Sequence, residues 1–247
     1  MSRDIQTNMK IMATFTTTIN ISPADVKILK DQGYSLYGFK SVAATGDGSP
    51  TVWFNLPTEK LLGKTKITWE EEFQAYNSTT TIAPKTKIEA SNTIATDLGQ
   101  LVTIEKGSGN IESSTDGYDG AVSFLNKDTQ QFTVGINQLV NGKSNILCAF
   151  PILGAGSSRV ITPITKIALI FSTEQIVTAT VITKAMSAGA FINLTGVTSR
   201  ETNYSIDSGW DAGGGTWLKN FDAFTDLKKL LIENTSRDEK ALSDKNK

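Results

Sequence analysis

The feature that most constrains the fold is a long alternation of apolar and polar residues between positions 64 and 76. Ile67, Trp69, Phe73 and Ala75 fall on one side of an extended chain, and polar residues occupy most of the positions between them. A period of two is typical of a β-strand with one buried face. The run therefore predicts a long half-buried strand, the longest of this kind in the sequence.

Shorter stretches rich in β-branched and aromatic residues recur along the chain, and turn residues separate them. With only two short helices beside them, they predict a mainly β protein: a single antiparallel β-sandwich, or a flattened barrel, with two flanking helices. The segment 106–120 is polar and Gly-rich, and it is predicted to be a loop. The predicted strands are 12–20, 34–44, 51–56, 64–76, 86–91, 98–105, 121–125, 130–136, 146–152, 161–172, 176–184 and 188–195.

Two segments carry helix signals. Ser22 is a favourable N-cap, Pro23 suits the first helical position, and Gly33 supplies a stop. Near the other end, five apolar residues have the spacing of one helical face, with Asp222 or Thr225 as a cap. No linker or repeat divides the chain, so residues 1–247 are predicted to form one domain with flexible ends at 1–10 and 236–247. The five apolar residues are Phe221, Phe224, Leu227, Leu230 and Leu231.

The composition excludes several functions. The sequence has no histidine, which removes Ser-His-Asp and Cys-His catalysis and zinc sites that use histidine. Its single cysteine, Cys148, lies in an apolar run and is predicted to be a buried, inert thiol. The 24 basic and 25 acidic residues nearly balance, which argues against nucleic acid as a partner. No cofactor, no metal site and no membrane-spanning helix is predicted.

The most unusual stretch spans residues 204–221. Half of the four tryptophans, Trp210 and Trp217, flank three consecutive glycines there. Glycine permits tight turns, and indole rings at a turn either pack on a core or face a ligand. We expect one of the pair to be a core residue and the other a contact residue.

Other aromatic residues lie near predicted strand ends or turns. For any single one of them a core position is favoured, because large aromatic side chains mainly supply buried area. As a group they suggest a binding surface. The predicted ligand-binding residues are Trp210, Trp217, Tyr204, Asp211, Trp53 and Tyr76.

Carboxylates offer the remaining route to catalysis. Glu71 falls between Trp69 and Phe73 on the apolar side of its strand, where a carboxylate must be paired, hydrogen-bonded or protonated. It is either an acid that faces a ligand or, as we favour, a carboxylate at an edge or bulge that reaches solvent or a lysine. Glu71, Asp207 and Asp211 could serve a hydrolase only if two of them lay about 5–10 Å apart across one groove.

Three segments carry a resemblance: GYSLYGFK at 33–40, ITWEEEFQAY at 67–76 and SGWDAGGGTW at 208–217. The chain resembles the actinoporin-like cytolysins and the fungal fruit-body lectins, and it is similar to unassigned microbial β-proteins of this size. The resemblance implies a β-sandwich that binds lipid or glycan. Residues 1–20 depart from the cytolysin pattern, since they predict a tail and a strand in place of an inserting amphipathic helix. Neither pore formation nor any residue role is therefore carried over.

The leading hypothesis is a non-enzymatic β-sandwich that binds a membrane or glycan surface through loop aromatics, as a cytolysin, toxin or defence protein. Its partner would be a lipid headgroup or a glycan. The alternative is a structural or self-assembling protein that forms homo-oligomers, and a carboxylate-based hydrolase is the least favoured. The first residues lack the apolar run of a signal peptide, which leaves the location open between the cytoplasm and release by a non-classical route.

Overall fold

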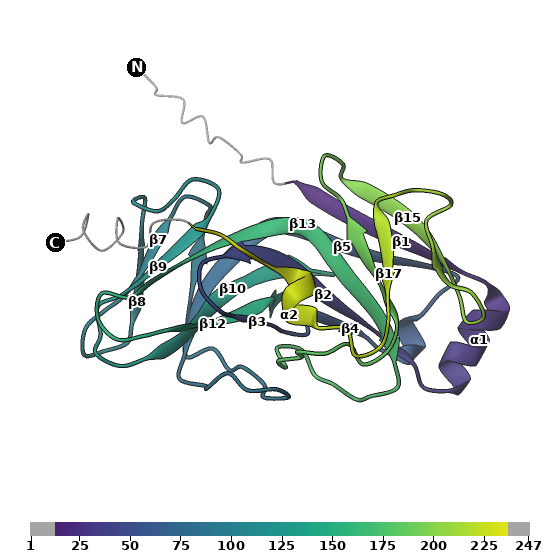
Figure 1. Cartoon of the computed structure of the whole chain (residues 1–247), viewed down its shortest axis with the longest axis horizontal. Helices are drawn as coiled ribbons and strands as arrows, with labels where there is room; N and C mark the ends of the chain where they lie inside the picture. Colours follow the sequence, from purple (N-terminus) through teal and green to yellow (C-terminus); the bar gives the residue numbers. More distant parts are fainter. Residues whose placement is uncertain (1–12, 237–247) are drawn as a thin grey trace, which may run out of the picture.

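The computed structural model describes residues 13–236, and β-strands dominate it. Strands make up 52% and helices 8%, which confirms the prediction of a mainly β protein. The strands form two curled nine-stranded sheets, each a half-barrel (Figure 1). The predicted flexible ends lie outside the described residues, except for Ser236.

The first sheet is built around the long strand β5 (Lys64–Ser78), the strand that the alternation predicts. β5 pairs with β1 on one side and with β10 on the other, and β6 pairs with one end of it. Its order is β16-β15-β1-β5-β10-β12-β3, with β6 and β11 attached to β5 and β10. The other strands of this sheet are β1 (Thr14–Ile21), β3 (Ser49–Pro50), β6 (Asn92–Thr96), β10 (Phe132–Val140), β11 (Lys143–Ile146), β12 (Cys148–Ile152), β15 (Ser199–Ser205) and β16 (Gly209–Asp211).

The second sheet is built around β13 (Ser158–Ser172), which pairs with β2, β9 and β14. Its main order is β17-β14-β13-β9-β7-β8, and β2 joins β13, β4 and β18. Among residues 13–236, three strand pairs are parallel (β1 with β15, β7 with β9, β2 with β18), so the sheets are mixed where the sequence predicts an antiparallel arrangement. The remaining strands are β2 (Ser35–Ala44), β4 (Phe54–Leu56), β7 (Leu101–Ile104), β8 (Ile111–Ser114), β9 (Val122–Asn126), β14 (Gly189–Asn193), β17 (Leu218–Phe221) and β18 (Ile232–Asn234).

The main core lies between the two sheets. It combines side chains of the first sheet, such as Ile67 and Trp69, with side chains of the second, such as Val42 and Ile167. Each of these residues has its side chain on the inner face because alternate residues of a strand point to the same side. The alternation from 64 to 76 therefore marks the wall of this core.

Both predicted helices are present, one at an end of the molecule and the other on the outer face of the second sheet. α1 (Pro23–Asp31) follows β1 at one end of the molecule (Figure 1), and the Ser22 hydroxyl accepts the backbone N–H of Asp25 at 3.0 Å, as its N-cap position predicts. α2 (Leu227–Leu231) packs Leu227 and Leu231 on the outer face of the second sheet. A short 3-10 turn, η1 (Thr58–Lys60), precedes β5.

Several local predictions are wrong. Segments 86–91 and 176–184 form isolated bridges in place of the predicted strands. Ile182 and Thr180 bond to the backbone of Pro50 and Val52, at the end of β3 and in the link that follows it. The predicted loop 106–120 contains β8, which pairs with β7. The helical pattern that begins at Phe221 is not helical until Leu227, because Phe221 ends a strand and Asp226, not Asp222 or Thr225, caps the helix.

Candidate functional site

Two of the predicted ligand-binding aromatics are core residues. Trp53 and Tyr76 are fully buried. The Trp53 indole donates to the backbone carbonyl of Gln138 at 3.3 Å, and the Tyr76 hydroxyl donates to that of Cys148 at 2.8 Å. Both polar tips are thus satisfied inside the protein, which leaves no surface of either side chain for an external ligand, and we correct their assignment.

The Trp/Gly stretch divides between core and surface. Trp210 is 5% exposed and stacks on Phe171, with ring centroids 5.5 Å apart, while Tyr204 packs edge-on against it. Trp217 is half-buried, and the guanidinium of Arg200 lies 5.1 Å from its ring centroid. Trp210 is therefore a core residue, and the indole of Trp217 is partly covered from within the chain.

Glu71 does not converge with the two candidate aspartates. In the ladder of the first sheet, Asp211 lies opposite Asn203, Asn203 lies opposite Asn20, and Asn20 lies opposite Lys64. Lys64 is seven residues before Glu71 on β5. Asp211 and Glu71 are therefore three strands apart, which is roughly 14 Å perpendicular to the strands, and seven residues apart, which is about 23 Å along the strands. Asp207 lies in the turn between β15 and β16, on the hairpin that carries Asp211. Glu71 and either aspartate are thus too far apart for the two-carboxylate geometry of a glycosidase.

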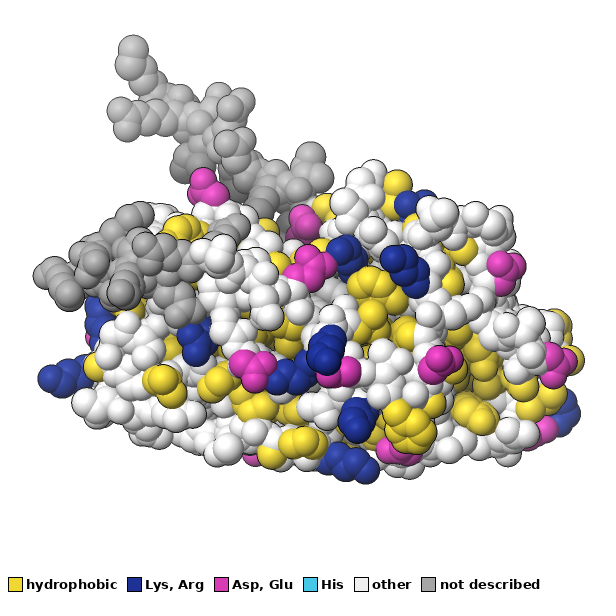
Figure 2. All heavy atoms as spheres, viewed as in Figure 1, with side chains coloured by type: hydrophobic (Ala, Val, Ile, Leu, Met, Phe, Trp, Pro, Cys, Tyr) yellow, Lys and Arg dark blue, Asp and Glu magenta, His cyan; other side chains and the backbone are white. Residues whose placement is uncertain are grey.

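A groove on the outer side of the molecule, near α2, is the better candidate. We call it the Phe224 groove. It consists of two adjoining hollows of about 260 and 430 Å³, which share Lys85, Glu174 and Ile182 in their walls. Figure 2 shows apolar side chains interspersed with Lys and Arg over this face. Its apolar lining is Ile176, Val177, Val181, Ile182, Ala185, Met186 and Phe224.

Strained backbone is concentrated at this groove. Among the described residues, four that are not glycine have a positive φ: Lys85, Asn141, Ala179 and Phe224. Asn141 precedes Gly142 in a hairpin turn, where this conformation is expected. The other three line the groove or, for Ala179, precede a residue that does. Such strain persists only where the surrounding structure enforces it, and it gathers at functional sites.

Phe224 is the clearest case. Its side chain is 75% exposed although its φ is +64°, a conformation in which a bulky residue is an outlier. Its backbone N–H donates to the carbonyl of Ala185 at 2.9 Å, and the N–H of Ala185 donates to Thr225 at 2.9 Å. The backbone at Phe224 is therefore fixed by hydrogen bonds while its ring stays exposed, and Val177, which is 58% exposed, lines the adjoining hollow.

Basic side chains around the groove carry positive charge that ion pairs do not neutralise. Lys87 pairs with Glu89 at 3.3 Å, whereas Lys85 and Lys184 make no ion pair with any residue from 13 to 236. Glu174 is the acid in the lining. Two free ammonium groups therefore stand beside the exposed Phe224 ring.

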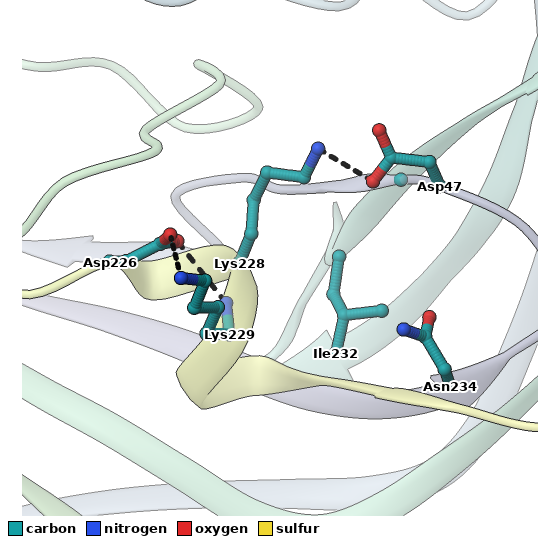
Figure 3. Close-up of a pocket in the computed structure, with 7 residues that line it drawn as sticks. Asp47, Asp226, Lys228, Lys229, Ile232 and Asn234 are labelled. Carbon is teal, nitrogen blue, oxygen red and sulfur yellow. Dashed lines mark hydrogen bonds and ion pairs between the residues drawn. The ribbon is translucent and has the colours of Figure 1, made fainter.

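A polar hollow of about 250 Å³ lies on the other side of α2 (Figure 3). Lys228 and Asp47 form an ion pair of 2.6 Å across it, and Asp226 caps α2 by accepting the backbone N–H of Lys229 at 3.2 Å. Its charged groups are thus largely engaged with one another. This polar hollow therefore offers fewer unengaged charged side chains to a ligand than the Phe224 groove does.

Residue patterns in the sequence do not predict this groove. Phe224 fits the helical spacing that includes Leu227 and Leu231, so the pattern assigns it to a buried face. Pro84 marks a turn at Lys85, where the N–H of Thr86 donates to the carbonyl of Ala83. Neither Lys85 nor Ala179 is itself a residue that normally adopts a positive φ, which Gly or Asn usually marks. In the described part of the chain, no three of the metal-ligating side chains cluster, and no helix is long and apolar enough to cross a membrane.

Comparison of the chain with protein-family models, with curated proteins and with solved structures found no match. The resemblance to cytolysins and lectins therefore remains a prediction.

Proposed function

We propose that this protein is a non-catalytic β-sandwich that docks on lipid bilayers containing anionic lipids through the Phe224 groove. The shared core between the two curled sheets supports the sandwich arrangement. The observation that carries the docking proposal is the Phe224 ring, which a strained and hydrogen-bonded backbone holds in solvent.

An exposed ring in a strained conformation opposes stability unless it meets an apolar partner. The acyl boundary of a bilayer provides that partner, and Val177 adds a second exposed apolar side chain in the adjoining hollow. The groove is made of two adjoining, partly open hollows, which suits a broad surface better than a small enclosed ligand.

The charges favour phospholipid over glycan. Lys85 and Lys184 flank the apolar rim and are free to reach headgroup phosphates. Each basic residue near an anionic surface contributes about 1 kcal/mol of attraction. A sugar is better matched by an aromatic ring with a polar tip, whereas Phe224 has none.

Catalysis receives no support from the positions of the candidate carboxylates, since Glu71 lies far from Asp207 and Asp211. Self-association is the competing use of the same apolar rim, because a second copy could also cover Phe224. The binding experiment therefore has to separate the two.

Sedimentation of the protein with sucrose-loaded vesicles tests the proposal. We expect binding to vesicles of phosphatidylcholine and phosphatidylserine, weakened by added salt and by omission of phosphatidylserine. Binding to a glycan array with no binding to vesicles would instead favour a lectin. Dimers or larger species at all concentrations in light scattering, without vesicle binding, would favour self-assembly.

A further inference from the structure

The polar hollow beside α2 shares a wall with the Phe224 groove. Asp226 lines the hollow and forms a backbone bridge with Lys184, which lines the groove. The next residue, Leu227, donates its backbone N–H to the carbonyl of Thr183 in the groove wall at 2.9 Å. A bilayer that covers the groove therefore places lipid headgroups beside the hollow.

Three supported segments set the shape of the polar hollow. Asp47 follows β2, and the next residue, Gly48, lies so close to the Phe150 ring that a Cβ would be 2.2 Å from it. Asn234 comes from β18, which pairs with β2. Lys228 comes from α2, which packs on the second sheet. The charged side chains of the hollow therefore project from a backbone that packing and pairing hold in place.

Two acids and two lysines line this hollow. Lys228 reaches across it to Asp47 and forms an ion pair of 2.6 Å (Figure 3). Lys229 lies 4.0 Å from Asp226, which also accepts the backbone N–H of Lys229. The side chains of Lys228 and Asp47 remain 33% and 85% exposed, and an ion pair in contact with water contributes little to stability. A ligand with one charge of each sign can therefore replace this pair by two new ones at little cost.

The chemistry of the lining matches a phosphate joined to a primary ammonium. The Lys228 ammonium can donate to a lipid phosphate, and a primary ammonium has three N–H groups to donate to the Asp47 carboxylate. A quaternary ammonium has no N–H group, and proteins recognise it with cages of aromatic rings. Among the described residues that line the hollow, none is aromatic.

The size of the hollow also matches a headgroup. Its volume of about 250 Å³ is below the roughly 300–1,000 Å³ of pockets that enclose a drug-sized ligand. A single headgroup fits such a space, whereas a whole lipid with its acyl chains does not. The acyl chains of a bound lipid would therefore stay in the bilayer.

We propose that the polar hollow binds phosphoethanolamine, the headgroup of phosphatidylethanolamine, and so adds lipid specificity to the membrane contact. This inference rests on the proposed function, because docking through the Phe224 groove is what brings the hollow to the bilayer. The lipid phosphate pairs with Lys228, and the lipid ammonium replaces Lys228 as the partner of Asp47. The groove attracts anionic lipids, and the hollow takes a zwitterionic lipid beside them.

Sedimentation of the full-length protein with two kinds of vesicle tests the headgroup site. Both contain the same fraction of phosphatidylglycerol, which supplies negative charge without an ammonium group, and the remainder is either phosphatidylethanolamine or phosphatidylcholine. We expect roughly fivefold tighter binding to the ethanolamine vesicles, the effect of one added ion pair. Equal affinities for the two kinds of vesicle would overturn the headgroup site and leave docking through the Phe224 groove standing.

Charge-removing variants separate the headgroup from the packing of the lipids. Asp47→Asn keeps the size of the side chain and removes its charge, so it should bind both kinds of vesicle with equal affinity. Asp31→Asn is the matched control, because Asp31 forms an exposed ion pair with Lys27 on α1, and it should keep the preference for ethanolamine. A preference that persists in Asp47→Asn would reflect looser lipid packing and would count against the site.

A soluble probe distinguishes failure of the site from failure of docking. Titration with glycerophosphoethanolamine should shift the NMR signals of the Gly48 backbone amide and the Asn234 side-chain amide, and glycerophosphocholine should leave them in place. These shifts in a protein that binds no vesicle would contradict docking and support the headgroup site. Equal shifts with both compounds, or none with either, would contradict the recognition of a primary ammonium.

Discussion

The ammonium group of Lys40 and the indole of Trp69 meet in the interior between the two sheets, 5.4 Å from nitrogen to ring centroid. This contact places a titratable group inside an otherwise apolar core. Its cost depends on pH, and so should the stability of the whole protein.

The stability should rise with pH between about pH 7 and 10.5. The folded-state pKa of Lys40 is lowered to about 7 from its ordinary value of 10.5, so the unfolded chain binds more protons across this interval. Because stability rises with pH wherever the unfolded state binds more protons, the slope approaches about 1.4 kcal/mol per pH unit. Below pH 7 both states are protonated and this contribution is constant.

Urea unfolding of the wild type and Lys40→Met at a series of pH values measures the effect. Lys40→Met should lack this part of the slope and should be the more stable protein at pH 7, since an apolar residue replaces a buried charge. A wild-type profile parallel to that of the variant would show that Lys40 is not desolvated in the folded state.

The two tryptophans of the Gly-rich stretch should differ in their effect on stability. Trp210→Ala removes a buried ring that stacks on Phe171 and should cost about 3–5 kcal/mol. Trp217→Ala removes a half-buried ring that contacts Arg200 and should cost roughly 1 kcal/mol. Denaturant midpoints of the two variants test this, and equal losses would contradict the division between core and surface.

Much of the fold could be predicted from the sequence because its signals are local. The alternation from 64 to 76 depends on neighbouring residues of one strand, and the cap at Ser22 depends on four residues. The parallel pairing of β1 with β15 joins residues about 180 positions apart, and no local pattern encodes it.

The candidate site was harder to predict for a physical reason. Phe224 has an apolar side chain and helical spacing, both of which indicate burial, yet backbone bonds to Ala185 hold it outward. The alternation marks Glu71 as a carboxylate on the apolar side of its strand, and its negative charge acts to raise the pKa of Lys40. Lys40 itself could not be identified, since a lysine in a strand is normally turned to solvent.

Relief of strain at Phe224 should stabilise the protein. Asn tolerates a positive φ better than Phe, and the exposed ring contributes little burial, so Phe224→Asn should gain up to about 1 kcal/mol. Leu62, which is 59% exposed and does not have a positive φ, provides the control. Leu62→Asn should not increase the stability that thermal unfolding measures. A loss of stability in Phe224→Asn would show that the ring supports the fold.

The lysines of the groove should contribute to binding and not to folding. Lys85→Gln and Lys184→Gln should each weaken binding to phosphatidylserine-containing vesicles roughly fivefold at low salt, equivalent to about 1 kcal/mol. The difference from the wild type should shrink as salt screens the attraction. Unchanged affinity and salt dependence in both variants would place the membrane contact elsewhere.

The most direct test of the proposed function compares vesicle affinities of the wild type, Phe224→Asn and Leu62→Asn under one lipid composition. Burial of one phenylalanine is worth about 1.5–3 kcal/mol, so Phe224→Asn should bind roughly tenfold or more weakly. Leu62→Asn should bind like the wild type. Equal affinities of Phe224→Asn and the wild type, or no binding of the wild type to any anionic vesicle, would contradict membrane docking through the Phe224 groove.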